Sequence, residues 1–395
     1  MVDQKTLAAT GNSLVAEAIR QCNPDVIPAY PITPQTTVVE ELAKFVAQGR
    51  MHAEYINVES EHSAMSASVG ASAAGARVAT ATSSQGLALM WEELHIAAGM
   101  RLPIVMFNAN RALSAPINIH CDHSDIMGAR DTGWIIMFAE TAQEAYDNTI
   151  MAFRIAEHPD VLLPVLTTAD GFITTHSIDR AEVMDDETVA KFVGEYVPTY
   201  ALLDTDNPTS HGNFAGLAGP YFEFKKQERT AIDASKPVIK QVGEEFSELT
   251  GRPFDLVETW GMEDADIAIV VIGSTAGNAR HVARDLRTKG VKAGVVKVRV
   301  FRPFPAEELR TALKGVKAVA VLDRSESFGA EGGPLFLEVR SALYDLETRV
   351  PLVNYIYGLG GSDVRLELME QVFSDLSDIA SGATAPFGLT YLGTR

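Results

Sequence analysis

Short apolar runs alternate with longer segments of helical periodicity through the first 170 residues, and this alternation limits the fold more than any other feature. Runs with the length of buried strands occupy residues 26–30, 78–82, 103–107 and 161–166. Apolar side chains recur at helical spacing in residues 36–46, 61–75 and 87–98. Because strands that alternate with helices pair in parallel and are covered on both faces, we predict an α/β fold with a parallel sheet.

The alternation stops in the middle of the chain and then resumes. Residues 197–236 contain several prolines and glycines and few periodic apolar positions, which is typical of an irregular connection. Residues 236–249 have an amphipathic helical pattern that ends before Gly251, and a second alternation of strands and helices starts at Ile267. We therefore predict a first α/β domain at 1–235 with an irregular C-terminal stretch, a linker helix at 236–254, and a second α/β domain at 255–395.

Charge and cysteine content exclude several classes of function. The 395 residues include 33 Lys and Arg against 52 Asp and Glu, and the net charge of −19 disfavours binding to nucleic acids and anionic membranes. No apolar stretch approaches the roughly 20 residues that span a bilayer, and the N-terminus lacks a signal-peptide pattern, so we expect a cytoplasmic protein. Cys22 and Cys121 are too few to bind an iron–sulfur cluster.

Polar residues that could carry chemistry follow several predicted strands. The segment 83–86, Ser-Ser-Gln-Gly, lies where ligands meet the carboxyl ends of parallel strands. Arg111 fits either a surface salt bridge or a clamp for a carboxylate. Glu61 starts a helix rich in Ala, Ser and Gly, and fits either an ordinary helix-terminal charge or a contact to a cofactor. Residues 120–125, His-Cys-Asp-His-Ser-Asp, are rich in metal ligands, but without matching ligands elsewhere we favour a hydrogen-bonded loop over a metal site.

Ordered motifs spread over nearly the whole chain combine into one pattern. They are Tyr30-Pro-Ile-Thr-Pro34, Val58-Glu-Ser-Glu-His-Ser-Ala64, Gly70-Ala-Ser-Ala-Ala-Gly-Ala76, Thr82-Ser-Ser-Gln-Gly-Leu87, Asn110-Arg-Ala-Leu-Ser-Ala-Pro116, Asp122-His-Ser-Asp125, Arg130-Asp-Thr-Gly-Trp134, Asp170-Gly-Phe172, Arg299-Val-Phe-Arg-Pro-Phe304, Asp323-Arg324 and Gly358-Leu-Gly-Gly361. Together they resemble the α subunit of multi-subunit pyruvate:ferredoxin oxidoreductase, also called pyruvate synthase, in the 2-oxoacid:ferredoxin oxidoreductase family.

The resemblance implies a fold and a reaction. The first domain is expected to be the pyrimidine-binding domain of a thiamine diphosphate enzyme, and the second a transketolase C-terminal-like α/β domain. The implied reaction is the reversible oxidative decarboxylation of pyruvate with coenzyme A to acetyl-CoA and CO₂, with the electrons passed to ferredoxin.

The resemblance also implies partner subunits. The chain has neither a Gly-Asp-Gly segment for Mg²⁺ nor a Cys-x-x-Cys run for clusters. We therefore expect thiamine diphosphate to be shared with a diphosphate-binding β subunit, and Mg²⁺ and [4Fe–4S] clusters to be held by partner subunits, which in this family include a γ and a ferredoxin-like δ subunit. The chain alone is expected to be inactive and to bind no metal.

Five residues match functional positions of the family. Glu61 matches the glutamate that bonds N1′ of the aminopyrimidine, Arg111 the arginine that binds the substrate carboxylate, and Thr33 the hydroxyl that bonds the substrate. Ser84 and Gln85 match the loop that faces the cofactor. His120 and Cys121 depart from the pattern expected of pyruvate-type relatives, which leaves their role open.

Thr33 bears on the choice of substrate. Oxalate-using relatives carry an arginine in the Tyr-Pro-Ile-x-Pro loop, whereas this chain has Thr33, so we do not expect oxalate as the substrate. Two alternatives stay open: another 2-oxoacid such as 2-oxoisovalerate, and a non-catalytic scaffold subunit. The scaffold would have no need to combine Glu61, Arg111 and Thr33.

Overall fold

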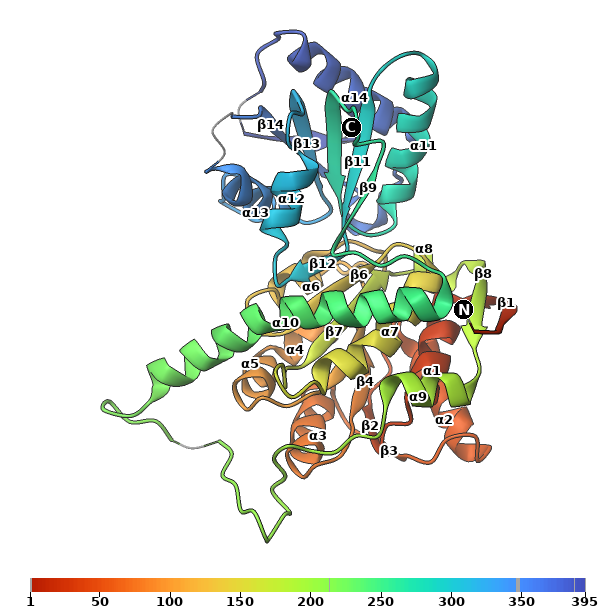
Figure 1. Ribbon diagram of the computed structural model, residues 1–395, viewed down its shortest axis with the longest axis vertical. Helices are drawn as coiled ribbons and strands as arrows, with labels where there is room; N and C mark the ends of the chain where they lie inside the picture. The colour runs from red at the N-terminus through yellow and green to blue at the C-terminus, as the bar shows by residue number, and fades with distance from the viewer. Residues whose placement is uncertain (1, 213, 346–348, 387, 395) are drawn as a thin grey trace.

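The first of two α/β units is built around a five-stranded sheet, in a computed structural model that describes residues 2–212, 214–345, 349–386 and 388–394 (Figure 1). The strand order is β12–β6–β7–β5–β4, and all pairs are parallel except β12 with β6. The strands are β4 (Ala79–Thr82), β5 (Val105–Asn110), β6 (Ile135–Ala139), β7 (Val165–Asp170) and β12 (Val300–Arg302). Every residue of β4 to β7 is buried, because helices cover both faces of the sheet.

Two further strand pairs belong to this unit. The parallel pair β2 (Val26–Ala29) and β3 (Glu54–Asn57) is joined to the main sheet by a bridge between Val26 and Val78, just before β4. The antiparallel pair is β1 (Gln4–Thr10) with β8 (Ile178–Met184). The helices are α1 (Gly11–Cys22), α2 (Thr36–Ala47), α3 (Glu61–Ala73), α4 (Ser84–Leu89), α5 (Trp91–Gly99), α6 (Ser124–Gly128), α7 (Ala142–Ala156), α8 (Ile173–His176) and α9 (Asp186–Val193).

The C-terminal unit contains a six-stranded sheet of order β15–β14–β13–β10–β11–β9, parallel except for β9. Its strands are β9 (Val257–Trp260), β10 (Ile267–Val271), β11 (Ala293–Val298), β13 (Ala318–Asp323), β14 (Leu352–Tyr357) and β15 (Leu389–Leu392). Its helices are α11 (Thr275–Thr288), α12 (Ala306–Ala312), α13 (Pro334–Leu343), the 3₁₀ turn η1 (Leu359–Gly361) and α14 (Leu366–Ala380). The predicted α/β class is confirmed.

The segment between the units differs from the prediction. The chain is irregular only up to Pro220, because the helix α10 (Tyr221–Thr250) begins 15 residues earlier than the predicted linker helix. Its first turns are mostly exposed, including the aromatic side chains at 221, 222 and 224, so they bury no regular apolar face, whereas its second half buries Ile239, Val242 and Phe246. No helix in the described part of the chain is long and apolar enough to cross a membrane.

The two units share both a sheet and a polar network. Strand β12 belongs in sequence to the C-terminal part of the chain, yet it completes the N-terminal sheet at the junction of the units (Figure 1). Because β12 crosses from one unit to the other, the sheets do not fix a domain boundary, and the predicted bounds at residues 235 and 254 stay a prediction. The first and last residues of the predicted domains, 1 and 395, lie outside the described residues.

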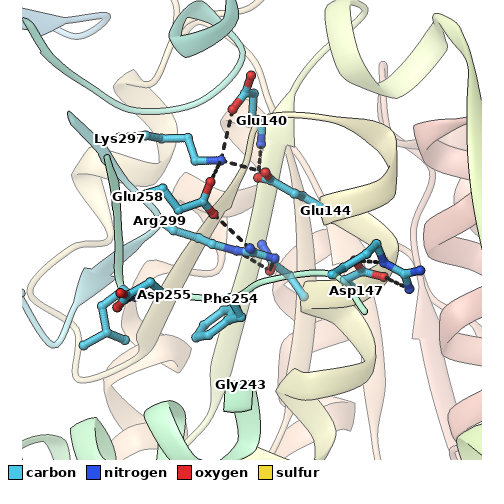
Figure 2. A network of polar contacts seen from close by, with 12 residues as sticks. Glu140, Glu144, Asp147, Gly243, Phe254, Asp255, Glu258, Lys297 and Arg299 are labelled. Atoms are coloured by element: carbon cyan, nitrogen blue, oxygen red, sulfur yellow. Dashed lines mark hydrogen bonds and ion pairs between the residues drawn. The ribbon is translucent and has the colours of Figure 1, made fainter. Parts of the chain in front are cut away.

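The polar network is centred on Lys297 of β11, which is only 2% exposed. Its ammonium group lies 3.0 Å from Glu140, 2.6 Å from Glu144 and 2.7 Å from Glu258 (Figure 2). Burial opposes the charge of this lysine, but the carboxylates raise its pKa above the ordinary value. Since Glu140 and Glu144 belong to the N-terminal unit, the network fixes one unit against the other.

Candidate active site

Glu61 is a buried carboxylate at the first position of α3. The helix begins there because Ser60 caps it, accepting a hydrogen bond from the Ser63 amide at 3.2 Å. Glu61 is 8% exposed, and its carboxylate has no hydrogen-bond partner within the described residues. The carboxylate oxygens are not among the enclosed side-chain atoms that lack a partner, so they still reach solvent, where a ligand donor can replace water.

The surroundings of Glu61 support the same conclusion. A Cβ atom added to Gly86 would lie 2.9 Å from Glu61 Oε1 and 2.5 Å from Thr82 Oγ1, so only glycine leaves this carboxylate in place. The Thr82 hydroxyl is also buried without a partner among the described residues. The Glu61 carboxylate and the Thr82 hydroxyl thus both pack closely against Gly86, and both can hydrogen-bond a nitrogen-rich ring such as an aminopyrimidine.

Arg111 follows β5 and is 6% exposed. Its Nε donates to the Asn118 carbonyl at 3.0 Å, and its Nη1 donates to the Thr33 carbonyl at 2.9 Å. Its Nη2 has no partner within the described residues, so it is free to bind an anion. Burial lowers the pKa of Arg111, but a guanidinium remains charged near neutral pH. The structure therefore brings Arg111 and Thr33 together, with the Thr33 side chain exposed beside the arginine.

Ser84 and Gln85 tie the start of α4 to the segment after Arg111. The Ser84 hydroxyl is buried and lies 2.6 Å from the Ala112 carbonyl, and Gln85 Nε2 donates to Ser114 Oγ at 3.0 Å. Through these contacts Ser84 and Gln85 hold the segment after Arg111 in place. Glu61 makes no direct hydrogen bond to this group, but it contacts Gly86, the residue after Gln85.

Asp125 is a residue that sequence reasoning missed. Its Oδ2 accepts hydrogen bonds from the amides of Ser84 at 3.0 Å and Arg111 at 3.1 Å, and from Asn108 Nδ2 at 3.0 Å. Burial raises its pKa to about 6. The available signal was the Asp122-His-Ser-Asp125 motif, which was interpreted as a hydrogen-bonded loop and as part of the family resemblance, without a role for Asp125 at the site.

The loop at residues 120–125 places Cys121 and His123 beside Asp170, with their ligand atoms within 4.8 Å of one another. His123 Nε2 lies 2.7 Å from Asp170, and Arg324 Nη1 donates to the same carboxylate at 3.2 Å. The positive charge that faces the Asp170 carboxylate is therefore supplied by Arg324, a residue of the chain itself. Burial raises the pKa of the Cys121 thiol well above its usual range, so the thiol stays protonated. His120 lies against Phe172, with 5.6 Å between ring centroids.

Comparison with known proteins assigns the family. Residues 17–244 match the family described as "Pyruvate flavodoxin/ferredoxin oxidoreductase, thiamine diP-bdg", and residues 265–369 match "Pyruvate:ferredoxin oxidoreductase core domain II". The pyruvate synthase subunit PorA of Thermotoga maritima is 54% identical over 93% of this chain and 94% of its own length. The chain belongs to the α-subunit family of the pyruvate:ferredoxin oxidoreductases. It is therefore an enzyme subunit, as the motifs predicted.

Other relatives of this α subunit extend the comparison. The PorA subunit of Methanocaldococcus jannaschii is 47% identical over 96% of this chain and 97% of its own length. The ketoisovalerate oxidoreductase subunit VorA of Pyrococcus abyssi is 44% identical, with 96% of each chain covered.

Solved structures support the fold. The 2-oxoglutarate:ferredoxin oxidoreductase of Magnetococcus marinus, with 2-oxoglutarate, coenzyme A and succinyl-CoA bound, has a TM-score of 0.72 at 19% identity. The match covers 96% of this α subunit, which spans 65% of that structure's chain. A split-gene transketolase has a TM-score of 0.57 at 13% identity, with 95% and 99% of the chains covered. The family model over residues 17–244 confirms the predicted thiamine diphosphate-binding domain, and the solved structures confirm the predicted transketolase-like architecture.

Proposed function

We propose that this chain, as the α subunit of its complex, acts on pyruvate, converting it with coenzyme A to acetyl-CoA and CO₂ and passing the electrons to ferredoxin in a reversible reaction. The closer similarity to a pyruvate synthase subunit than to ketoisovalerate subunits, 54% against 44% identity, supports pyruvate over the branched substrate. Thr33, a short neutral side chain beside Arg111, supports a monocarboxylic substrate rather than oxalate.

The observation that carries the proposal is the Glu61 carboxylate, which belongs to a largely buried residue and has no hydrogen-bond partner within the described residues. When bound, thiamine diphosphate supplies the nucleophilic carbon that adds to a 2-oxoacid and the electron sink for its decarboxylation. Glu61 holds the pyrimidine ring through N1′, and a carboxyl group at that atom moves the proton that the ring must gain and lose. Gly86 lets Thr82 and the Glu61 carboxylate pack closely against the start of α4, and Ser84 and Gln85 support the loop beside them.

Arg111 binds the substrate carboxylate through its free Nη2. Its other nitrogens are held by the carbonyls of Asn118 and Thr33, so the guanidinium is oriented before the substrate arrives. The hydroxyl of Thr33 hydrogen-bonds the substrate. Because the carboxylate leaves as CO₂, the arginine must orient it without favouring the bound acid over the transition state.

The remaining parts of the active centre come from partner subunits. We assign the diphosphate and Mg²⁺ to a β subunit, because this chain has no Gly-Asp-Gly segment, and the [4Fe–4S] clusters to other subunits, including a ferredoxin-like δ beside a γ subunit. A cytoplasmic location fits two free, buried cysteines. A 2-oxoisovalerate oxidoreductase is the second proposal, which the VorA similarity supports.

Two measurements test this function. The complex, co-expressed with its partner subunits, is assayed with pyruvate, 2-oxoisovalerate, 2-oxoglutarate and oxalate, with coenzyme A and ferredoxin present. We expect the highest kcat/KM for pyruvate, whereas a preference for 2-oxoisovalerate would replace pyruvate by the second proposal. Metal analysis and calorimetry on the purified chain should show no iron and no high-affinity binding of Mg²⁺–thiamine diphosphate, and stoichiometric iron would refute the assignment to partners.

A further inference from the structure

The loop that orients Arg111 is held by the C-terminal unit of the chain. Asn118, whose carbonyl accepts from Arg111 Nε, donates through its side chain to the Gly360 carbonyl at 2.9 Å. The Gly360 amide in turn donates to Asp122 at 3.0 Å. Two points of the loop are therefore bonded to η1, which is more than 200 residues away in the sequence.

The same turn is anchored to the core by a buried ion pair. Arg324 donates through Nε to the Gly358 carbonyl at 3.2 Å and through Nη1 to Asp170 at 3.2 Å. Its own carbonyl accepts from the His123 amide at 2.8 Å. Asp170, at the end of β7, also accepts from Ser274 of the C-terminal unit at 2.5 Å. Although burial opposes its charge, His123 and Arg324 hold the pKa of Asp170 well below the usual range.

The glycines of η1 allow it to lie directly against the loop. Gly360 has a φ of +59°, and a Cβ atom there would lie 2.5 Å from Asn118 Nδ2. At Gly361 an added Cβ would lie 2.3 Å from the Cβ of His120. A side chain at either position would push the loop away, and its carbonyl at Asn118 would move with it.

We propose that η1, anchored by Arg324 and Asp170, positions Arg111 for the substrate carboxylate, and that Asn118 and Gly360 are positioning residues for substrate binding. This inference rests on the role of Arg111 in the proposed function. The C-terminal unit thereby acts on the substrate pocket without touching the substrate. The buried cluster of Cys121, His123 and Asp170 is part of this support.

The test compares kinetics of complexes assembled with variant chains. Asn118 is half-buried and makes no ion pair in the described structure, so Asn118→Ala removes the link with little risk to folding. We expect Asn118→Ala and Gly360→Ala to raise the KM for pyruvate about tenfold while kcat changes less than about twofold, because ground-state and transition-state binding are lost together. Thiamine diphosphate content should stay normal.

The matched control is Arg280→Gln. This change breaks another contact between the units, the bond from Arg280 to Glu140, without touching the loop, so it should leave the KM for pyruvate unchanged.

A double-mutant cycle separates this inference from the proposed function. Lysine has no Nε to bond the Asn118 carbonyl, so Asn118→Ala in an Arg111→Lys background should change KM less than about twofold. Additive effects in the cycle, or an unchanged KM in Asn118→Ala, would overturn the positioning role and leave the role of Arg111 intact. A normal KM in Arg111→Lys itself would overturn both.

Discussion

Glu61 and Arg111 are each more than nine-tenths buried, and within the described residues each keeps polar atoms without a protein partner. Burying a charge without full compensation costs stability, so a chain does this at a site that a ligand completes. The two residues have opposite charges and so suit different parts of the reaction centre, a ring nitrogen and a carboxylate.

The first prediction concerns proton movement at Glu61. Glu61→Gln keeps the volume of the side chain but removes its ability to exchange a proton with N1′. We expect the assembled complex to lose about 10²- to 10⁴-fold in kcat, the usual contribution of a positioned acid or base. Steady-state kinetics measure this, with Glu59→Gln, an exposed neighbour, as the control. Near-normal turnover of Glu61→Gln would show that this carboxylate does not serve the cofactor.

The second prediction concerns Arg111. Arg111→Lys keeps the positive charge but loses the planar set of donors that bonds Asn118, Thr33 and a carboxylate at the same time. We expect kcat/KM for pyruvate to fall at least about tenfold, which is about 1.4 kcal/mol, with normal thiamine diphosphate content. The exposed Arg284→Lys serves as the control. If the Arg111 variant behaves like this control, a partner subunit must bind the carboxylate.

At the scale of elements, the junction of β13 and α13 contains a carboxylate whose protonation affects folding. Asp323 accepts from the amides of Leu335 at 2.7 Å and Phe336 at 3.1 Å, in the first turn of α13. Burial raises its pKa to about 6 from an ordinary 3.8. Between these two values the folded chain holds a proton that the unfolded chain has lost, so this group favours folding more as the pH falls through about 6.

The third prediction follows from that difference. Asp323→Asn cannot take up the proton, so the advantage of the wild-type chain over the variant should grow by about 1 kcal/mol between pH 7 and pH 5. Urea unfolding of both chains at each pH measures the change. A difference that does not vary with pH would mean that Asp323 titrates alike in the folded and unfolded chains.

Some elements were predictable and others were not, for a physical reason. The strands β2 and β4 were predicted within one residue of their bounds, and β10 begins at Ile267, where the second alternation was predicted to start. Helix α7 was missed because nearly all of it is buried, so it has no polar face and no clear periodicity. Its buried Asp147 and Asn148 are bonded by Arg252 and Arg299, which lie about 100 or more residues further along the chain.

The candidate site was likewise predictable from the sequence only in part. Motif resemblance identified Glu61, Arg111 and Thr33, whose assigned roles stay predictions. Asp125 and Arg324 stand in motifs of the resemblance, but their supporting roles could not be predicted, because most of their partners are backbone amides and carbonyls that the sequence does not place. Ser84 illustrates the limit: its motif predicts a position facing the cofactor, whereas its hydroxyl lies against the Ala112 carbonyl.

At the scale of the whole molecule, Lys297 pairs with three carboxylates, of which Glu140 and Glu144 belong to the other unit. The fourth prediction is that Lys297→Met lowers the free energy of unfolding by about 3–5 kcal/mol, because it leaves buried negative charges facing one another. Chemical denaturation of the purified chain measures this. Lys317→Met, which breaks an exposed pair with Asp266, should cost less than about 1 kcal/mol. Equal losses in both variants would mean that the network adds nothing beyond a surface ion pair.

Because of strand β12, the first sheet can be completed only after most of the chain has been synthesised on the ribosome. The first sheet lacks its outer strand until residues 300–302 have emerged, and until then β6 presents an unpaired backbone edge. Most N-terminal domains complete their folding while the rest of the chain is still being made, but this one must wait for a strand encoded far downstream. A gene cut near residue 254 would leave that edge open permanently, so the shortened protein is expected to aggregate through β6 instead of folding as an independent module.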